Sequence, residues 1–413
     1  MRLCLLFQLG GIIAGVHLAV GQTYQDFDQP PHRYFERTPT DRFTQLKAGL
    51  ESGQIALDRT SEKAFLLSLL KLLHIPVSSQ MLVFSTTSLQ LSLISPSNPR
   101  ALYFSEDLYV GYIPGGKIEI VSLDPDLGGV FYIFDIPHGD GPVKADRSTR
   151  CMNCHAADET GHVPGLVAKS VVPGPTGGSM VSYRINQTGH AIPLEERFGG
   201  WHVTGANVFT NHWGNLMGRF VAGEIVKIPN PPGERFRFST YVAETSDILA
   251  HLVHEHQVGF VNRVVEATYR ARTHTHTDGE KLTAEHAEEL DQQAKGIVRY
   301  MLFTDEVPFP SGGVEGDSTF RSEFQESRKT VGSAALKDWD LKTRLFKYRC
   351  SYMIYSAVFM GLPKPVKSMV YRRLGEALSP GTSDVQYAYL SEDEKRAIRE
   401  ILKETLTDLP QGW

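Results

Sequence analysis

The chain has 413 residues, of which 41% are hydrophobic, and a formal net charge of −5 at pH 7. This length supplies an ample core, so the fold does not need disulfides or a structural metal for its stability. The weakly acidic balance, without a sustained basic run, argues against nucleic acid or an anionic membrane surface as a partner.

The N-terminal segment 1–21 has the pattern of a secretory signal peptide. One positive charge at Arg2 precedes an apolar stretch over residues 3–20, and small residues flank the expected cleavage site near Gly21. A retained membrane anchor is the alternative, because the stretch is close to the length that spans a bilayer. We expect an exported, periplasmic protein that has no membrane span once the peptide is cleaved.

Residues 22–80 begin with a polar, proline-bearing lead-in and continue into two predicted helices. Apolar residues recur at helical spacing in "DRFTQLKAGLESG" and in "SEKAFLLSLLKLLHI". Residues 81–244 differ, because short runs rich in β-branched and aromatic residues, such as "KIEIVSL" and "GVFYIFDI", alternate with turns. We predict antiparallel strands in this region, with a hairpin at "VVPGPTGGS".

Residues 245–413 are predicted to be largely helical. Helices are expected over about 245–270 and 280–303, and in "LKTRLFKYRCSYMIYSAVFMG", "PVKSMVYRRLGEAL" and "SEDEKRAIREILKET". The predicted fold class is therefore α+β, with an antiparallel β-rich half packed against a largely helical C-terminal half.

The stretch "TRCMNCHAAD", within the β-rich region, places Cys151 and Cys154 three positions apart with His155 directly after them. Two thiols at this spacing can form thioethers with the two vinyl groups of one porphyrin, while the next imidazole binds its iron. The motif predicts one covalently attached haem c, with His155 as the proximal iron ligand. The β-rich half would then hold the haem attachment site and the helical half would complete the haem pocket.

Three other uses of the cysteine pair remain open but are less favoured. A zinc site needs a second ligand pair, and a thioredoxin-like redox pair needs a βαβ setting; the sequence shows neither. A structural disulfide fits poorly with three cysteines in the exported chain. The third, Cys350, is expected to be a buried thiol that behaves as a small hydrophobic residue.

The segments "STRCMNCHAADETGHVPGLVAKSVV", "EERFGGWHVTG", "HWGN", "EHQ" and "YRCSYMIYS" resemble an uncharacterised family of secreted bacterial proteins with one covalent haem in a cytochrome c domain. The resemblance covers most of the chain from about residue 100 onward. It implies haem binding and electron transfer, and no particular substrate. His202 departs from the family, which has an aromatic residue after the tryptophan of the "GGW" segment.

The ligand on the far side of the iron decides between an electron carrier and a catalyst. His256 is the first candidate, because it lies near the centre of an apolar stripe on a predicted helix, whereas His251 and His254 fall on the opposite face, which we expect to be solvated. His212 is the second candidate, in a turn-rich segment. Met217 is the third, since its spacing from His155 resembles that of the methionine ligand in small class I cytochromes c.

Further roles around the haem are predicted for residues near the motif. His190, His202 or an empty position are the remaining options for the sixth ligand. The backbone near Pro164 is expected to accept a hydrogen bond from the proximal imidazole. Arginines near the motif could meet the haem propionates and two tryptophans could line the porphyrin (Arg147, Arg150, Arg197, Trp201 and Trp213). His274 and His276 are interpreted as part of a polar loop rather than a metal site.

These features predict a periplasmic cytochrome with a single haem c that passes electrons between redox partner proteins. The alternatives are a haem enzyme, peroxidase-like or acting as a small-molecule reductase, and a haem-based sensor. A carrier should be six-coordinate and low-spin in both oxidation states, whereas an enzyme needs an open position on the iron.

Overall fold

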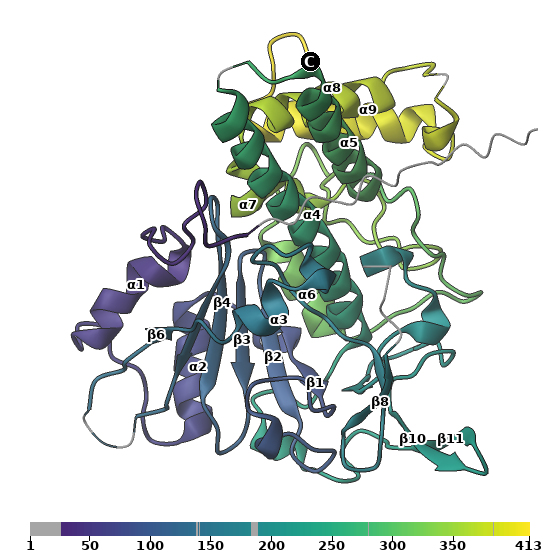
Figure 1. Cartoon of the computed structure of the whole chain (residues 1–413). Helices are drawn as coiled ribbons and strands as arrows, with labels where there is room; N and C mark the ends of the chain where they lie inside the picture. Colours follow the sequence, from purple (N-terminus) through teal and green to yellow (C-terminus); the bar gives the residue numbers. More distant parts are fainter. Residues whose placement is uncertain (1–25, 138, 140, 183–188, 280, 383) are drawn as a thin grey trace, which may run out of the picture.

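The computed structural model describes residues 26–137, 139, 141–182, 189–279, 281–382 and 384–413, so the predicted signal peptide lies outside the described residues (Figure 1). A seven-stranded antiparallel sheet forms the centre of the N-terminal half, in the order β6-β5-β4-β3-β2-β1-β9. Its strands are β1 Met81–Val83, β2 Arg100–Phe104, β3 Leu108–Tyr112, β4 Ile118–Asp124, β5 Gly128–Phe134, β6 Asp146–Arg147 and β9 Trp201–His202.

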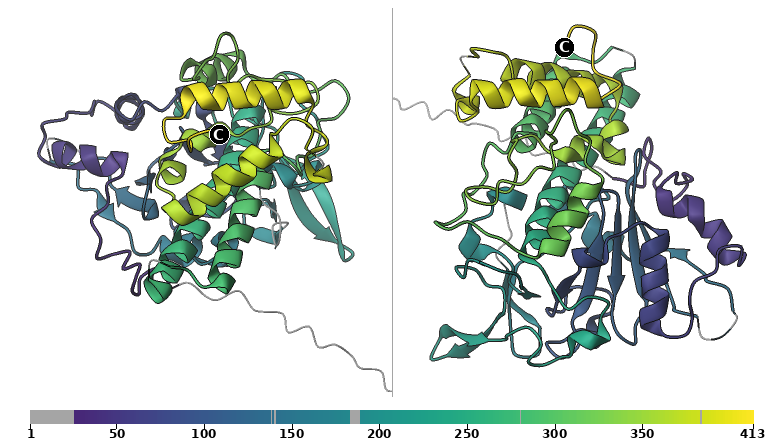
Figure 2. Two further views of the ribbon diagram at one scale, coloured as in Figure 1. Left: turned by 90° about the horizontal axis from the view of Figure 1, so that it is seen from above. Right: turned by 180° about the vertical axis from the view of Figure 1, so that it is seen from behind.

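One face of the sheet is covered by the N-terminal helices α1 (Arg42–Glu51) and α2 (Glu62–Leu72), as the view from behind shows (Figure 2). The side chains of Asp41 and Ser61 accept hydrogen bonds from backbone N–H groups in the first turns of α1 and α2, respectively. The apolar residues of α2 recur at helical spacing and are buried against the strands (Phe65, Leu66, Leu69 and Leu70). Both predicted N-terminal helices are confirmed.

The other face of the sheet packs against α4 (Ile248–Asp278), a helix of 31 residues. Strand residues on this face join α4 in a second core (Met81, Val83, Phe104, Tyr109 and Leu123). Helix α4 is buried on nearly all sides, because further helices and loops cover the surfaces that the sheet does not. The helix therefore links the sheet to the helical half of the molecule.

The C-terminal helices gather around the upper part of α4 (Figure 1). They are α5 Ala284–Met301, α7 Ala357–Met360, α8 Lys364–Ala377 and α9 Glu392–Thr405, while α6 Ser318–Glu326 lies lower along α4. Two small hairpins complete the β structure: β7 Val171–Pro173 with β8 Ser179–Ser182, and β10 Leu216–Val221 with β11 Glu224–Pro229. The predicted α+β class is confirmed, as is the hairpin at "VVPGPTGGS". No described helix is long and apolar enough to span a membrane.

Two predictions about the helical half are wrong. The run "LKTRLFKYRCSYMIYSAVFMG" contains only a 3₁₀ turn, Tyr352–Tyr355, and the short helix α7, because the side chains of Ser351 and Ser356 cap two separate turns and interrupt a continuous helix. His274 and His276 lie in the last turns of α4, not in a loop. Helix α6 was not predicted.

Candidate haem attachment site

Cys154 lies on a single helical turn, α3 (Met152–His155), which follows the edge strand β6, and Cys151 is the N-cap residue of that turn. Cys151, directly before α3, is half-buried, whereas Cys154 is exposed; both are free thiols. Burial raises the pKa of the Cys151 thiol. The turn is preceded by an antiparallel strand and followed by a loop, which is not the βαβ setting that a thioredoxin-like pair would need.

His155 is oriented by the backbone of the loop that follows it. Its Nδ1 atom is 3.0 Å from the carbonyl oxygen of Gly165, and the Gly165 N–H donates to the His155 carbonyl at 2.8 Å. A ring that donates from Nδ1 keeps its lone pair on Nε2, and no hydrogen bond of Nε2 is found among the described residues. The backbone acceptor predicted near Pro164 is therefore present, one residue further along the chain.

The imidazole of His155 is held in its neutral form. Burial lowers its pKa from 6.5 to about 4, although the hydrogen bond to Gly165 acts in the opposite direction. The ring packs on Phe131 of β5, with ring centroids 4.5 Å apart. Because only neutral imidazole can donate a lone pair to a metal, His155 is ready to act as a ligand near pH 7.

The loop from His155 to Leu166 is fastened to both halves of the molecule. The Gly129 N–H of β5 donates to the Pro164 carbonyl at 2.9 Å. From the other side, Asn262 of α4 accepts from the Leu166 N–H at 2.7 Å and donates to the Leu166 carbonyl at 2.8 Å. The loop therefore places the acceptor for His155 at a position that the sheet and α4 determine together.

The residues at this site fit a covalent haem. Two unbridged thiols stand one helical turn apart, and the adjoining imidazole has one nitrogen fixed by a carbonyl and the other without a protein partner. This is the donor set that haem c attachment uses. Within the described part of the chain, no group of three or more His, Cys, Asp or Glu side chains is placed to hold a metal ion by itself.

His256, the first distal candidate, uses both ring nitrogens inside the protein. Its Nδ1 is 2.9 Å from Nδ1 of His190, its Nε2 is 2.7 Å from Oγ of Ser351, and its ring stacks on Phe303. Burial lowers its pKa to about 3. His256 is thus satisfied as a core histidine, and this arrangement gives its assignment as an iron ligand no support. Nε2 of His190 is buried without a hydrogen-bond partner among the described residues.

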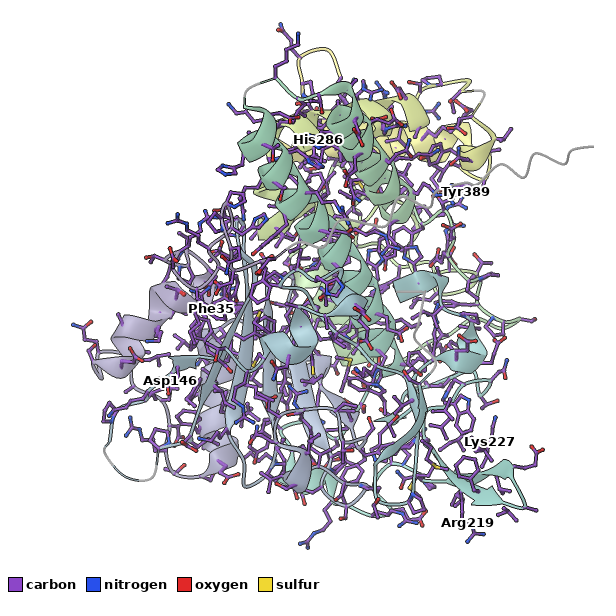
Figure 3. All side chains as sticks on the ribbon, viewed as in Figure 1. Phe35, Asp146, Arg219, Lys227, His286 and Tyr389 are labelled. Carbon is purple, nitrogen blue, oxygen red and sulfur yellow. The ribbon has the colours of Figure 1, made fainter. Side chains whose placement is uncertain are left out.

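The other two distal candidates also lie in protein surroundings of their own. Nδ1 of His212 accepts from the Gly214 N–H at 2.9 Å, and its ring sits edge-on to Phe198 and Phe209. Met217 is 1% exposed in the β10–β11 hairpin. That hairpin, on which Arg219 and Lys227 are labelled, projects far from α3 (Figures 1 and 3). No contact between Met217 and His155 is found among the described residues, and the sixth ligand stays a prediction.

The expectation that His251 and His254 are solvated is wrong. They are 3% and 6% exposed. The Nε2 of His251 lies 2.9 Å from the carbonyl of His202, and the ring of His254 packs near Tyr109 and Phe104. A helix covered from several sides buries polar positions as well as its apolar stripe, so a solvated face cannot be inferred from the pattern alone.

The predicted arginines and tryptophans have varied surroundings. Arg147 donates to backbone carbonyls of Tyr34 and Arg37, and Arg197 is buried and donates to the carbonyls of His190 and Ile192, so both guanidinium groups already bind the backbone. Arg150 is exposed beside the motif. The Trp201 indole donates to the Lys169 carbonyl, and Lys227 lies over Trp213. Cys350 is fully buried, as predicted.

Sequence reasoning missed the residues that support His155 from a distance. The pattern of the sequence gives ordinary strand or helix positions to Phe131, Gly129 and Asn262. Of the three, only Asn262, a polar residue with mostly apolar neighbours in the sequence, could have attracted attention. Comparison of the chain with protein-family models, with curated proteins and with solved structures found no match.

Proposed function

We propose that this chain is an exported, periplasmic c-type cytochrome that carries one covalent haem and transfers electrons between redox partner proteins. Cys151 and Cys154 would be the thioether tethers and His155 the proximal iron ligand. The resemblance to secreted bacterial proteins with a cytochrome c domain belongs to the same proposal.

One observation carries the proposal: His155 donates from Nδ1 to the Gly165 carbonyl, while its Nε2 has no partner among the described residues and two free thiols stand directly before it. His256, by contrast, uses both of its ring nitrogens for hydrogen bonds inside the core. A ligand histidine has one nitrogen held by a carbonyl or carboxylate and the other directed to the metal.

When bound, the haem would supply reversible one-electron chemistry. The protein's own residues would orient and protect the ligand: Gly165 fixes the tautomer of His155, and Phe131 covers one side of its ring. Asn262 and Gly129 hold the loop in place, which limits movement of the ligand between oxidation states. Exposed Cys154 puts the attachment point at the surface, within reach of a partner protein.

Covalent attachment is tested by expressing the chain in a host that matures c-type cytochromes. The purified protein should carry the added mass of one haem, and the pigment should stay with the polypeptide in acidified organic solvent. Cys151→Ala/Cys154→Ala should lose covalent haem, whereas Cys350→Ala, which removes the third free thiol, should retain it. Correctly matured wild-type protein that carries no haem, or releases all of it into the solvent, would refute the proposal.

The carrier role is tested by spectra of the holoprotein in both oxidation states. Six-coordinate, low-spin iron in each state and no turnover of peroxide are expected for a carrier. A high-spin resting spectrum with peroxide turnover would contradict electron transfer as the function while leaving covalent haem binding intact.

A further inference from the structure

The sheet face beneath His155 carries a pair of opposite charges. Phe131, which contacts the His155 ring, pairs across the strands with Val121 of β4, and Glu119 lies two residues further along β4 on the same face. Such diagonal neighbours are about 7–8 Å apart. Gly111 of β3 pairs with Glu119.

The guanidinium of Arg100, from β2, reaches Glu119 by crossing Gly111. A Cβ atom at Gly111 would stand 2.5 Å from Nη2 of Arg100, so the absence of a side chain there lets the arginine lie flat across β3. Nη2 of Arg100 forms an ion pair with Glu119. The two side chains are 17% and 16% exposed, which leaves them much less screened by salt than surface charges.

The carboxylate of Glu119 is held in place by further groups, whereas one nitrogen of Arg100 is not. Oε1 of Glu119 accepts hydrogen bonds from Ser88 at 2.8 Å and from Gln90 at 2.9 Å. Nε of Arg100 is buried and has no hydrogen-bond partner among the described residues. Removing two charges from water costs free energy, and here one donor of the pair also lacks a hydrogen bond among the described residues. The pair is therefore a weak source of stability, which favours a functional role for it.

The pair also lies within electrostatic range of the motif, because Glu119 is a diagonal neighbour of Phe131 and the Phe131 ring lies 4.5 Å from the His155 ring. The same two charges would therefore act on the iron that His155 would bind whenever the charge of that iron changes.

We propose that the Arg100–Glu119 pair sets the reduction potential of the haem that Cys151, Cys154 and His155 would hold. This inference rests on the proposed function. Reduction lowers the positive charge at the iron, so a nearby cation favours the reduced form and a nearby anion favours the oxidised form. Arg100 raises the potential and Glu119 lowers it, and the ion pair keeps the two effects in balance.

The test compares midpoint potentials of the holoprotein by spectroelectrochemistry. Arg100→Gln should lower the midpoint potential and Glu119→Gln should raise it. Each shift should be about 59 mV, which for a one-electron couple is a tenfold change in the equilibrium constant with a reference couple. Arg100→Lys, which keeps the charge, should change it little. The control is Lys117→Gln, beside β4, which removes a charge whose side chain is 46% exposed and pairs with Asp135.

Opposite signs separate an electrostatic effect from a structural one. If the pair served only to hold the sheet, both glutamine variants would move the potential in the same direction and would alter the absorption bands, a result that overturns the inference. Unchanged potentials in a protein with covalent haem would also overturn it while leaving the proposed function standing. If Arg100→Gln does not fold, the other two variants still test the inference. Glu119→Gln must raise the midpoint potential, and Arg100→Lys must leave it nearly unchanged.

Discussion

Replacing Asn262 with alanine is the most direct perturbation of the haem attachment loop that leaves the C-x-x-C-H motif untouched. The side-chain amide of Asn262 satisfies both backbone groups of Leu166, and these bonds join α4 to the loop that carries the acceptor for His155. Alanine at this position removes both hydrogen bonds at once and introduces no new charge.

The size of the effect follows from burial. Leu166 is 4% exposed and Asn262 is 8% exposed, so water reaches the freed groups poorly. A buried backbone N–H or C=O without a partner costs about 1–3 kcal/mol, and relaxation of the loop recovers part of this, so we expect a loss of about 2–4 kcal/mol in the free energy of unfolding.

The assay combines urea denaturation with amide hydrogen exchange read by mass spectrometry. Besides the loss of stability, exchange should become faster in the segment 156–166, because the Gly165 N–H bond to His155 depends on the position of the loop. The midpoint potential of the haem should change as the acceptor for His155 Nδ1 becomes less ordered.

Asn215 provides a matched control, since its side chain makes the same pair of bonds with Val203, at 2.8 Å each. Asn215 has a φ of 62°, so glycine is the replacement that avoids left-handed strain. Asn215→Gly should reduce stability and speed exchange near Val203, but not in the segment 156–166. Unchanged stability in Asn262→Ala, or equally fast exchange of the loop in both variants, would refute the reasoning.

Three further predictions concern single residues of helices α4 and α5. His256→Ala should lose about 3 kcal/mol of stability in urea denaturation, because it removes the hydrogen bonds to His190 and Ser351 and opens a cavity, whereas a change in haem spin state would contradict this placement. Burial lowers the pKa of His251 from 6.5 to about 3. Below pH 6.5 the unfolded chain therefore binds more protons at this residue than the folded chain, and the stability that neutral His251 contributes is lost as pH falls. The stability difference between wild type and His251→Gln should therefore shrink by up to about 1.4 kcal/mol per pH unit below pH 6.5 in denaturation series, and a constant difference would argue against it. Gly296→Ala in α5, where a Cβ meets no atom within 4 Å, should raise the free energy of unfolding by about 0.5–1 kcal/mol, and a lower value would contradict the open environment.

Local spacing in the sequence determined the features that depend on neighbouring residues. The run Cys151, Cys154 and His155 indicates one kind of chemistry because tethers and ligand lie within five residues. The strands and most helices follow from hydrophobic periodicity, and the α+β class follows from their order along the chain. The backbone acceptor for His155 was predictable to within one residue, since it lies in the loop that leaves the motif.

Only the tertiary structure decided how the buried polar residues are used. His256 on the apolar stripe of α4 has the sequence pattern of a ligand, yet its partners His190 and Ser351 come from 66 and 95 residues away. The Arg100–Glu119 pair exists because β2 and β4 flank Gly111, which no local pattern reveals. Whether a buried polar group is satisfied depends on atoms that are distant in sequence, and those are placed only when the sheet and α4 pack together.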